Sequence, residues 1–305
     1  MKNIALIFPG QGAQKVGMGL EFYRSSPAAK TFFHEADKIC PNLTKVMFEG
    51  PEEKLTTTAY CQPAIVTMSM AALKAFQAHE KYKGINVKLT AGLSLGEYSA
   101  LVAAGVMNFA DALRLVQKRA AFMEESALEN QGAMAAVIDF DQSKLEDICR
   151  KMGVQIANYN SHNQVVITGL KTNVEKAMDA IKSAGCERVI PLMVSGGFHS
   201  PLMASAATKF AAVLNDVVIT PSPIAALSNV TAKPHQDAME IRTNLTRQIT
   251  SSVQWVKSVE YIVSQGITEC IEIGPGRVLK GLIRRINPAV NVLNIEKPAD
   301  IEALP

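Results

Sequence analysis

The chain has 305 residues, of which 48% are hydrophobic and 19% charged, and its formal net charge is +3. This composition is typical of a soluble protein with a sizeable core in one or two domains, and the small net charge argues against a dedicated nucleic-acid-binding protein. Five scattered cysteines without a C-x-x-C pair predict reduced thiols in a cytoplasmic protein, not disulfides or a zinc site. We expect neither a signal peptide nor a membrane span, because the apolar runs are too short.

The first part of the chain alternates strand-like and helix-like segments. A strand is expected at 4–8, a glycine-bearing loop at 9–14 and a strand end at 88–91. The helices expected in this part are 27–39, 62–79, 95–104 and 109–128. Asn108 is a plausible N-cap of the last of these helices, with Asp111 in its first turn.

The pattern changes after residue 132. Strands at 133–139, 154–157, 165–168 and 187–192 and helices at 142–152 and 172–184 follow in the order β-α-β-β-α-β, which is that of a ferredoxin-like unit. We therefore expect an α/β protein in which a ferredoxin-like domain, 129–196, is inserted into a larger domain made of 1–128 and 197–305. The second part of the larger domain is expected to hold helices near 201–213, 238–249 and 253–265, a strand at 269–273 and a basic helix ending at Arg285.

Residues 92–97, Gly-Leu-Ser-Leu-Gly-Glu, form a G-x-S-x-G pattern between an expected strand and an expected helix. A serine in such a turn projects its hydroxyl and leaves amide N–H groups free nearby. The two glycines are needed because side chains would collide where the chain doubles back. The pattern also arises by chance, but its context favours Ser94 as a nucleophile in an α/β-hydrolase-like large domain.

A serine hydroxyl needs a base, and the best candidate among the five histidines is His199. It follows paired glycines at the return into the large domain. His34 and His79 are expected on polar helix faces and His235 in a loop, all three solvated, and His162 in a turn of the small domain. No acid stands at a suitable strand end, so either a backbone carbonyl orients the histidine or there is no catalytic triad.

Arg119 shares one face of the long helix with Leu115 and Phe122. An arginine on an apolar face either extends its charged end to solvent or an ion pair, or binds a substrate carboxylate through two parallel hydrogen bonds.

The loop 9–14 lacks the ending of a P-loop, and Lys15 stands where the third glycine of G-x-G-x-x-G would be. Nucleotide binding is therefore not expected there. We expect the N–H of Gln11 to contribute to an oxyanion hole instead.

Together these residues resemble those of the malonyl-CoA:acyl carrier protein transacylases, the acyltransferase family of fatty acid synthesis. The resemblance covers nearly the whole chain, up to about Arg285. Six motifs carry it in order: Phe8-Pro9-Gly10-Gln11-Gly12-Ala13-Gln14, Gly92-Leu93-Ser94-Leu95-Gly96-Glu97-Tyr98-Ser99-Ala100, Gln117-Lys118-Arg119, Phe198-His199-Ser200-Pro201, Gln248 before Val253-Gln254-Trp255, and Glu272-Ile273-Gly274-Pro275-Gly276.

The resemblance implies a role for each of four residues. Ser94 would carry the malonyl group, His199 would be the base, the main-chain carbonyl of Gln248 would orient it, and Arg119 would bind the malonyl carboxylate. The implied reaction moves malonyl from malonyl-CoA to the phosphopantetheine thiol of an acidic acyl carrier protein that binds transiently. It needs no metal and no cofactor bound by the enzyme, which is expected to be a monomer.

The resemblance also extends to the surroundings of the serine. The N–H groups of Gln11 and Leu95 would form the oxyanion hole, and Asn158 matches a family asparagine near the site. Phe198 fits the malonyl-selective form of the family better than the methylmalonyl form. Leu93 departs from the histidine that many relatives have there, so any hydrogen bond that this histidine gives elsewhere is absent.

Two other functions use the same residues. A serine thioesterase or esterase would let water attack the acyl-serine and would not need Arg119, and a carrier-binding module with a decayed site would need no chemistry. The presence of Ser94, His199 and Arg119 disfavours the second. Lys280, Arg284 and Arg285 form a basic stretch of the last expected helix, which is either a solvated face or a docking site for the carrier.

Overall fold

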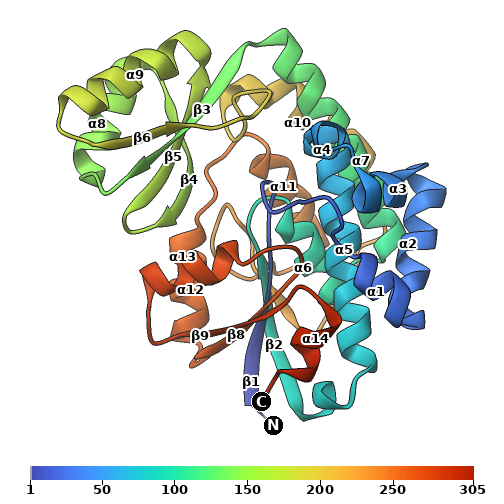
Figure 1. Cartoon of the computed structure of the whole chain (residues 1–305). Coiled ribbons are helices and arrows are strands. Elements are labelled where there is room, and N and C mark those ends of the chain that lie inside the picture. Colours follow the sequence, from blue (N-terminus) through green and yellow to red (C-terminus); the bar gives the residue numbers. More distant parts are fainter. Residues whose placement is uncertain (1) are drawn as a thin grey trace.

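The computed structural model describes residues 2–305, which form two β-sheets and the helices around them (Figure 1). The strands are β1 (Lys2–Phe8), β2 (Ile85–Gly92), β3 (Gly132–Ile138), β4 (Gln155–Ser161), β5 (Gln164–Leu170), β6 (Arg188–Pro191), β7 (Ala225–Ala226), β8 (Glu269–Ile273) and β9 (Asn291–Ile295). The α-helices are α1 (Leu20–Ser25), α2 (Pro27–Ile39), α3 (Leu43–Glu49), α4 (Glu52–Thr56), α5 (Thr58–Ala78), α6 (Gly96–Ala103), α7 (Phe109–Glu129), α8 (Gln142–Met152), α9 (Lys171–Ser183), α10 (Ala204–Leu214), α11 (Ala238–Gln248), α12 (Trp255–Ser264), α13 (Val278–Ile286) and α14 (Pro298–Glu302).

The larger sheet is parallel and is covered on both faces. Its order is β7-β2-β1-β8-β9. Alternate residues of the central strand β1 enter different clusters: Leu6 and Phe8 pack on the side of α2, α5 and α7, and Ala5 and Ile7 pack on the side of α12 and α13. Burial on both faces explains why this strand is a continuous apolar run in the sequence.

The smaller sheet is antiparallel, with the order β4-β5-β3-β6. Helices α8 and α9 cover one of its faces around a separate apolar cluster. This order and the β-α-β-β-α-β sequence of elements are those of a ferredoxin-like unit, so the expected α/β fold class is confirmed. The domain limits at 129 and 196 remain a prediction.

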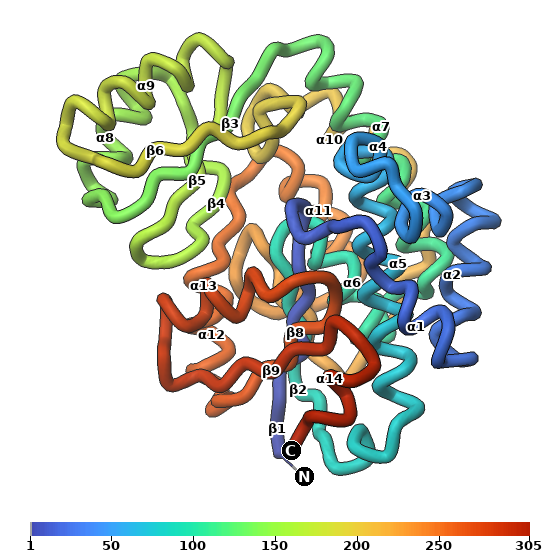
Figure 2. Tube along the Cα trace, viewed as in Figure 1, coloured from blue at the N-terminus to red at the C-terminus, as the bar shows by residue number. Residues whose placement is uncertain are grey.

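The chain enters the smaller sheet from α7 and leaves it toward α10, and these two connections pass close to each other (Figure 2). A Cβ atom on Gly132 would lie 2.1 Å from the backbone nitrogen of Gly197, and one on Gly196 would lie 2.6 Å from the Cβ of Ala127. A Cβ atom on Gly197 itself would lie 2.9 Å from Cδ1 of Leu202 and 3.0 Å from the carbonyl oxygen of Gly169, so both glycines before His199 pack closely against their surroundings, as the sequence indicated.

Several element boundaries differ from those predicted from the sequence. Helix α12 begins at Trp255 and not at residue 253, because Val253 exchanges backbone hydrogen bonds of 2.8 and 3.0 Å with Ala157 and Tyr159 of β4. Strand β4 continues to Ser161 and not only to residue 157. Helix α5 begins at Thr58, four residues before the predicted start, and a short 3-10 turn precedes α10. Strands β7 and β9 and helices α1, α3, α4 and α14 were not predicted.

Helix α7 begins where the sequence indicated. The side chain of Asn108 accepts a 2.8 Å hydrogen bond from the backbone N–H of Asp111, which satisfies one of the free donors of the first turn. Across residues 2–305, no helix is both long and apolar enough to span a bilayer.

Candidate active site

Ser94 occupies a tight turn between β2 and α6. Its backbone φ is +52°, in the left-handed region that a residue with a side chain rarely adopts. A Cβ atom on Gly92 would lie 2.0 Å from the carbonyl carbon of Gly96, and one on Gly96 would lie 2.1 Å from the carbonyl oxygen of Phe8. The steric reason that we expected for the two glycines of the G-x-S-x-G pattern is confirmed.

His199 connects Ser94 to Gln248. Its Nε2 lies 2.8 Å from Oγ of Ser94, and its Nδ1 lies 2.8 Å from the carbonyl oxygen of Gln248. Because a carbonyl only accepts, the proton of a neutral imidazole is on Nδ1, and the lone pair on Nε2 faces the serine hydroxyl. The structure thus places a main-chain carbonyl at the position where many catalytic triads have an acid.

The imidazole of His199 is buried, with 6% of the residue exposed. Burial, and then the positive charge of Arg119, lower its pKa to about 4, although the backbone carbonyls of Gln248 and Ser251 act in the opposite direction. The ring is therefore neutral near pH 7, the state in which it can accept a proton.

Arg119, on α7, is 1% exposed. Its Nη1 donates to the side-chain oxygen of Gln62 at 2.8 Å, and its Nη2 lies 3.1 Å from Oε1 of Gln248 and 3.2 Å from Oγ of Ser94. The guanidinium carbon lies 5.5 Å from the ring centre of Tyr98. Burial lowers the pKa of the guanidinium.

This arginine has no carboxylate at ion-pair distance within residues 2–305, and its Nε has no hydrogen-bond partner there. Burying a cation without an opposite charge is costly. Of the roles left open by the sequence, extension to solvent and a direct ion pair are therefore both excluded for the described residues, the first because the side chain is buried.

A pocket of about 170 Å³ opens beside Ser94, lined by Gln11, Leu93, Ser94, Leu95, Arg119, Met123, Met134, Asn158, Asn160, Val166, Leu192, Val194, Phe198 and His199. It lies between the elbow and the smaller sheet. The backbone N–H groups of Gln11 and Leu95 donate to no other group of residues 2–305. All the site residues expected from the sequence except Gln248 therefore line one pocket, and Gln248 is hydrogen-bonded to three of them, Ser94, Arg119 and His199.

The pocket wall contributed by β4 contains one residue that the sequence analysis missed. Asn158 and Asn160 are both buried, and Oδ1 of Asn160 has no hydrogen-bond partner within the described chain. Alternation along a strand places the two on similar sides, but the predicted strand ended before them. Phe198 also lines the pocket, and its carbonyl oxygen accepts the hydroxyl hydrogen of Thr168, on β5, at 2.8 Å.

Two further residues that the sequence analysis missed form hydrogen bonds with the site residues. Gln62 joins Arg119 to Gln11 through its side-chain amide, with hydrogen bonds of 2.8 and 3.3 Å. Asn229 accepts the backbone N–H of Ser94 at 2.5 Å. A polar residue inside the apolar run 61–66 was a detectable signal for Gln62, whereas nothing in the sequence distinguishes Asn229 from other loop asparagines.

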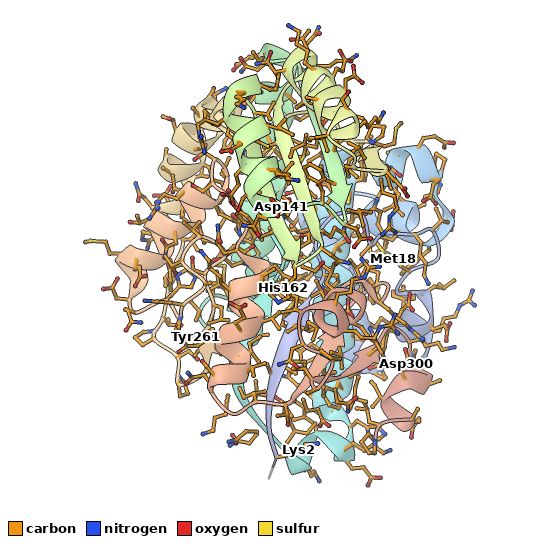
Figure 3. The ribbon with its side chains drawn as sticks, turned by 90° about the vertical axis from the view of Figure 1, so that its left-hand side faces the viewer. Lys2, Met18, Asp141, His162, Tyr261 and Asp300 are labelled. Atoms are coloured by element: carbon orange, nitrogen blue, oxygen red, sulfur yellow. The ribbon has the colours of Figure 1, made fainter. Side chains whose placement is uncertain are left out.

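The remaining histidines are found in different settings. His34 is exposed, as expected, and His162 is exposed in the turn between β4 and β5, on the side of α12 (Figure 3). The expectation that His79 is solvated holds only in part, because it is half-buried and lies 3.1 Å from Glu302. The expectation for His235 was wrong: its side chain is 2% exposed and lies 3.0 Å from the buried carboxylate of Glu97. The loop folds back over α6 and buries the ring.

Lys280, Arg284 and Arg285 are exposed on α13. Arg285 donates to the side-chain oxygen of Gln164 at 2.9 Å, so it links α13 to the smaller sheet. The other two side chains form no ion pair within residues 2–305.

A parallel α/β sheet with a serine at a nucleophile elbow and a neutral histidine beside it is typical of enzymes that transfer acyl groups through serine. Residues 5–289 match the family model described as acyl transferase domain, and the chain belongs to this family. It is similar to the malonyl CoA-acyl carrier protein transacylase of Bacillus subtilis strain 168, with 42% identity over 99% of this chain and 96% of the relative.

Solved structures agree with this assignment. The acyl-carrier-protein S-malonyltransferase of Bartonella henselae is 38% identical, with a TM-score of 0.93 over 99% of this chain and 98% of that one. The same identity, TM-score and coverage are found for a malonyl-transacylase that was solved in complex with a type II polyketide acyl carrier protein.

Proposed function

We propose that the protein transfers the malonyl group of malonyl-CoA to the phosphopantetheine thiol of an acyl carrier protein, supplying fatty acid synthesis. The observation that carries this proposal is the buried guanidinium of Arg119, which forms no direct ion pair within residues 2–305, reaches the carboxylate of Glu97 only through Gln248, and lies 3.2 Å from Oγ of Ser94. A substrate that combines a thioester with a free carboxylate would supply the missing charge. The names of the relatives support the same substrate.

In the first step, Nε2 of His199 takes the proton of the Ser94 hydroxyl while Oγ attacks the thioester carbon. The carbonyl oxygen becomes an oxyanion that the N–H groups of Gln11 and Leu95 stabilise, each by about 3 kcal/mol in comparable sites. When the intermediate collapses, the C–S bond breaks and the sulfur of coenzyme A leaves with the proton from His199. Malonyl-Ser94 remains.

The second step runs the same chemistry in the opposite direction. His199 takes the proton of the phosphopantetheine thiol, whose sulfur attacks the malonyl ester on Ser94. The ester C–O bond breaks, and Oγ recovers the proton from His199. No metal or bound cofactor takes part in the proposed steps, because the thioester supplies the activated acyl group.

Substrate binding strengthens the base in this mechanism. The charge of Arg119 is one of the causes that lower the pKa of His199. A malonyl carboxylate on Arg119 offsets that charge, so the pKa of His199 rises toward its ordinary value when the correct substrate is bound. A substrate without the carboxylate would not have this effect.

The acceptor is proposed to be acidic and to bind only transiently, near the basic residues of α13. We also infer that the enzyme acts as a monomer in the cytoplasm. The five cysteines, all buried and without disulfide bonds, are consistent with a reducing compartment.

Radiolabelled malonyl-CoA, incubated with the protein in the presence and absence of holo acyl carrier protein, tests the proposal. Label on the carrier supports the transferase. Free malonate without carrier labelling would indicate a hydrolase, and no turnover in either reaction would indicate a carrier-binding protein.

A further inference from the structure

A fully buried carboxylate, that of Glu97, lies directly behind the catalytic elbow. Its Oε2 accepts the backbone N–H of Asn229 at 3.1 Å and Nε2 of Gln248 at 2.6 Å. Its Oε1 lies 3.0 Å from Nε2 of His235. A carboxylate removed from water is tolerated only with such a set of donors, so Glu97, Gln248, His235 and the backbone of Asn229 form one coupled unit.

Two members of this unit hold the backbone of Ser94 on both sides. Asn229 accepts the Ser94 N–H at 2.5 Å and donates to the carbonyl oxygen of Gly92 at 2.7 Å. Gln248 donates from Nε2 to the carbonyl oxygen of Ser94 at 3.0 Å. Both peptide groups that flank the nucleophile are therefore fixed by residues to which Glu97 is hydrogen-bonded, Asn229 through its backbone N–H and Gln248 through its side chain.

Ser94 needs such restraints because its φ of +52° is unfavourable for a residue with a Cβ atom. A backbone in this region persists only where the surroundings hold it. If the peptide groups of Ser94 relaxed, Oγ would leave its position 2.8 Å from Nε2 of His199. If the side chain of Gln248 lost its bond to Glu97 and the residue shifted, its carbonyl, which orients His199, would shift with it.

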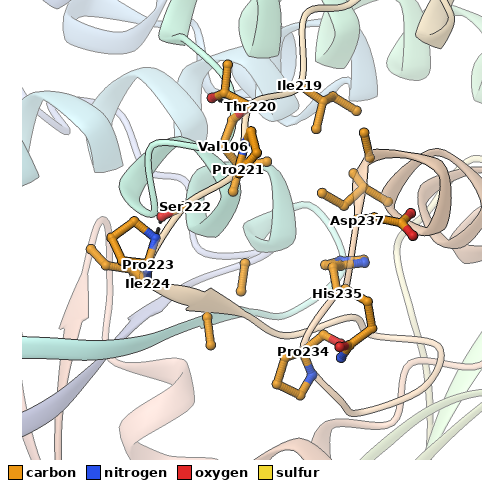
Figure 4. Close-up of a pocket in the computed structure, with 15 residues that line it drawn as sticks. Val106, Ile219, Thr220, Pro221, Ser222, Pro223, Ile224, Pro234, His235 and Asp237 are labelled. Atoms are coloured by element: carbon orange, nitrogen blue, oxygen red, sulfur yellow. Dashed lines mark hydrogen bonds between the residues drawn. The ribbon is translucent and has the colours of Figure 1, made fainter.

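His235 closes the unit on the side away from Ser94. Its ring lines a cavity of about 340 Å³ formed by residues 219–226 and 234–238 with Val106 and Ile241 (Figure 4), and its Nε2 lies 3.0 Å from Oε1 of Glu97. Nδ1 is 3.5 Å from Nδ2 of Asn244, an amide that also donates to Glu240. This arrangement leaves Nε2–H as the donor toward Glu97.

We propose that Glu97 is a positioning residue for acyl transfer, held by His235, which keeps Ser94 in its reactive conformation through Asn229 and Gln248. Glu97 contacts none of the reacting atoms. The inference rests on the proposed function for its substrate, but it concerns the reactivity of the serine itself.

The first test replaces Glu97 by Gln. The side chain keeps its size, but one carboxylate oxygen, which accepts a hydrogen bond, becomes an NH2 group that faces a hydrogen-bond donor of its partners. The rate at which a fluorophosphonate labels Ser94 is measured, together with kcat and KM for malonyl-CoA. We expect labelling and kcat to fall roughly 10- to 100-fold, as for the loss of a hydrogen bond to a charged group, with KM changed less than about threefold.

A matched control is the other fully buried carboxylate, Glu272, which accepts the backbone N–H groups of Leu279 and Lys280 away from the elbow. Glu272→Gln should lower the melting temperature but leave the labelling rate of Ser94 unchanged. Labelling of folded Glu97→Gln at the wild-type rate, or a change in KM alone, would overturn the proposal.

A second pair of variants decides the matter if Glu97→Gln does not fold. Gln at position 235 places an amide donor near the position of Nε2, whereas Leu has no donor. His235→Gln should label within about threefold of wild type and His235→Leu roughly tenfold more slowly. Wild-type labelling of both variants would overturn the role of His235.

These outcomes are separable from a failure of the proposed function. The fluorophosphonate carries neither coenzyme A nor a malonyl group, so slow labelling of Glu97→Gln supports the inference even if the wild-type protein transfers no malonyl. Conversely, normal malonyl transfer by both wild type and Glu97→Gln would contradict the inference and leave the proposed function intact.

Discussion

Nη2 of Arg119, on α7, lies 3.2 Å from Oγ of Ser94, in the turn before α6, and the side chain of Gln248 bonds to both residues, to the Arg119 guanidinium and to the Ser94 carbonyl oxygen. In malonyl-serine, the free carboxylate carbon is three covalent bonds from Oγ. A malonyl group that folds back over this short distance brings its carboxylate to the guanidinium. An acetyl group on the same serine leaves the buried cation without a carboxylate in direct contact.

Substrate choice should therefore depend on Arg119. Arg119→Ala is expected to reduce kcat/KM for malonyl-CoA by at least about a thousandfold, because the group that binds the carboxylate is lost. It should also raise kcat/KM for acetyl-CoA relative to that for malonyl-CoA, because no buried guanidinium is then left unpaired. The measurement is the ratio of kcat/KM for the two thioesters. Arg119→Lys should recover only part of the ratio, since an ammonium lacks the planar pair of donors.

An unchanged ratio in Arg119→Ala would mean that the carboxylate is recognised elsewhere in the pocket. The melting temperature of each variant serves as the control, because a buried arginine also contributes packing.

The covalent intermediate should be visible directly. Malonyl-CoA without carrier protein is expected to add one malonyl group to the wild-type chain, since Oγ of Ser94 lies at hydrogen-bond distance from a neutral imidazole. Intact-mass spectrometry measures the adduct. Ser94→Ala should not gain it, and an adduct on that variant would show that another residue is the nucleophile.

The pH dependence of Ser94 reactivity should be unusually flat. The reactive form has neutral His199, whose pKa is lowered to about 4 by burial and by the charge of Arg119. Protonation, and hence loss of activity, therefore begins only as the pH falls toward 4. Fluorophosphonate labelling should change less than about twofold between pH 8 and 5.5, whereas an ordinary histidine near 6.5 would give a roughly tenfold decrease.

The same profile in Arg119→Ala provides the control for the cause. The positive charge of Arg119 is one of the two causes that lower the pKa of His199. Without this charge the pKa should rise, so the decrease in labelling rate should begin at a higher pH. A profile identical to that of the wild type would assign the lowered pKa of His199 to burial alone.

Carrier docking on α13 predicts a selective effect of charge. Reversal of Lys280 and Arg284 to Glu should raise KM for the carrier protein and not for malonyl-CoA, and added salt should slow transfer by the wild type. Arg285 is left in place because it bonds to Gln164. The matched control reverses Lys176 and Lys182 on α9, which changes the net charge equally; equal effects of both double variants would contradict docking at α13.

Replacing each of two glycines by alanine should change the free energy of unfolding in opposite directions. Gly92→Ala would place its Cβ 2.0 Å from backbone and should destabilise the protein by more than about 3 kcal/mol. Gly281, inside α13, has open space around its Cβ, and Gly281→Ala should stabilise by about 0.5–1 kcal/mol. Chemical denaturation measures both changes, and similar values for the two would refute the steric argument for the elbow.

Much of the local structure followed from the sequence by itself. Short-range features such as the elbow glycines, the Asn108 cap and the period of the apolar residues determine the geometry of the neighbouring backbone. The strand before Ser94, the long helix and the order of elements in the smaller sheet were therefore predictable. The proposed nucleophile and base, Ser94 and His199, stand out because few residue types can perform their chemistry. The limits of α12 and β4 were not predictable, because Val253 and β4 pair across nearly a hundred residues.

The partners of the catalytic groups were decided by the tertiary structure. Every residue carries a carbonyl, so nothing local distinguishes the one on Gln248 that lies 2.8 Å from His199. Whether Arg119 meets an acid, and whether His235 is solvated or bound to Glu97, depends on which distant segments pack against each side chain. Burial and the distances between partners depend on the packing of the whole fold. These two quantities determine the charge, the pKa values and the reactivity of the groups in the site.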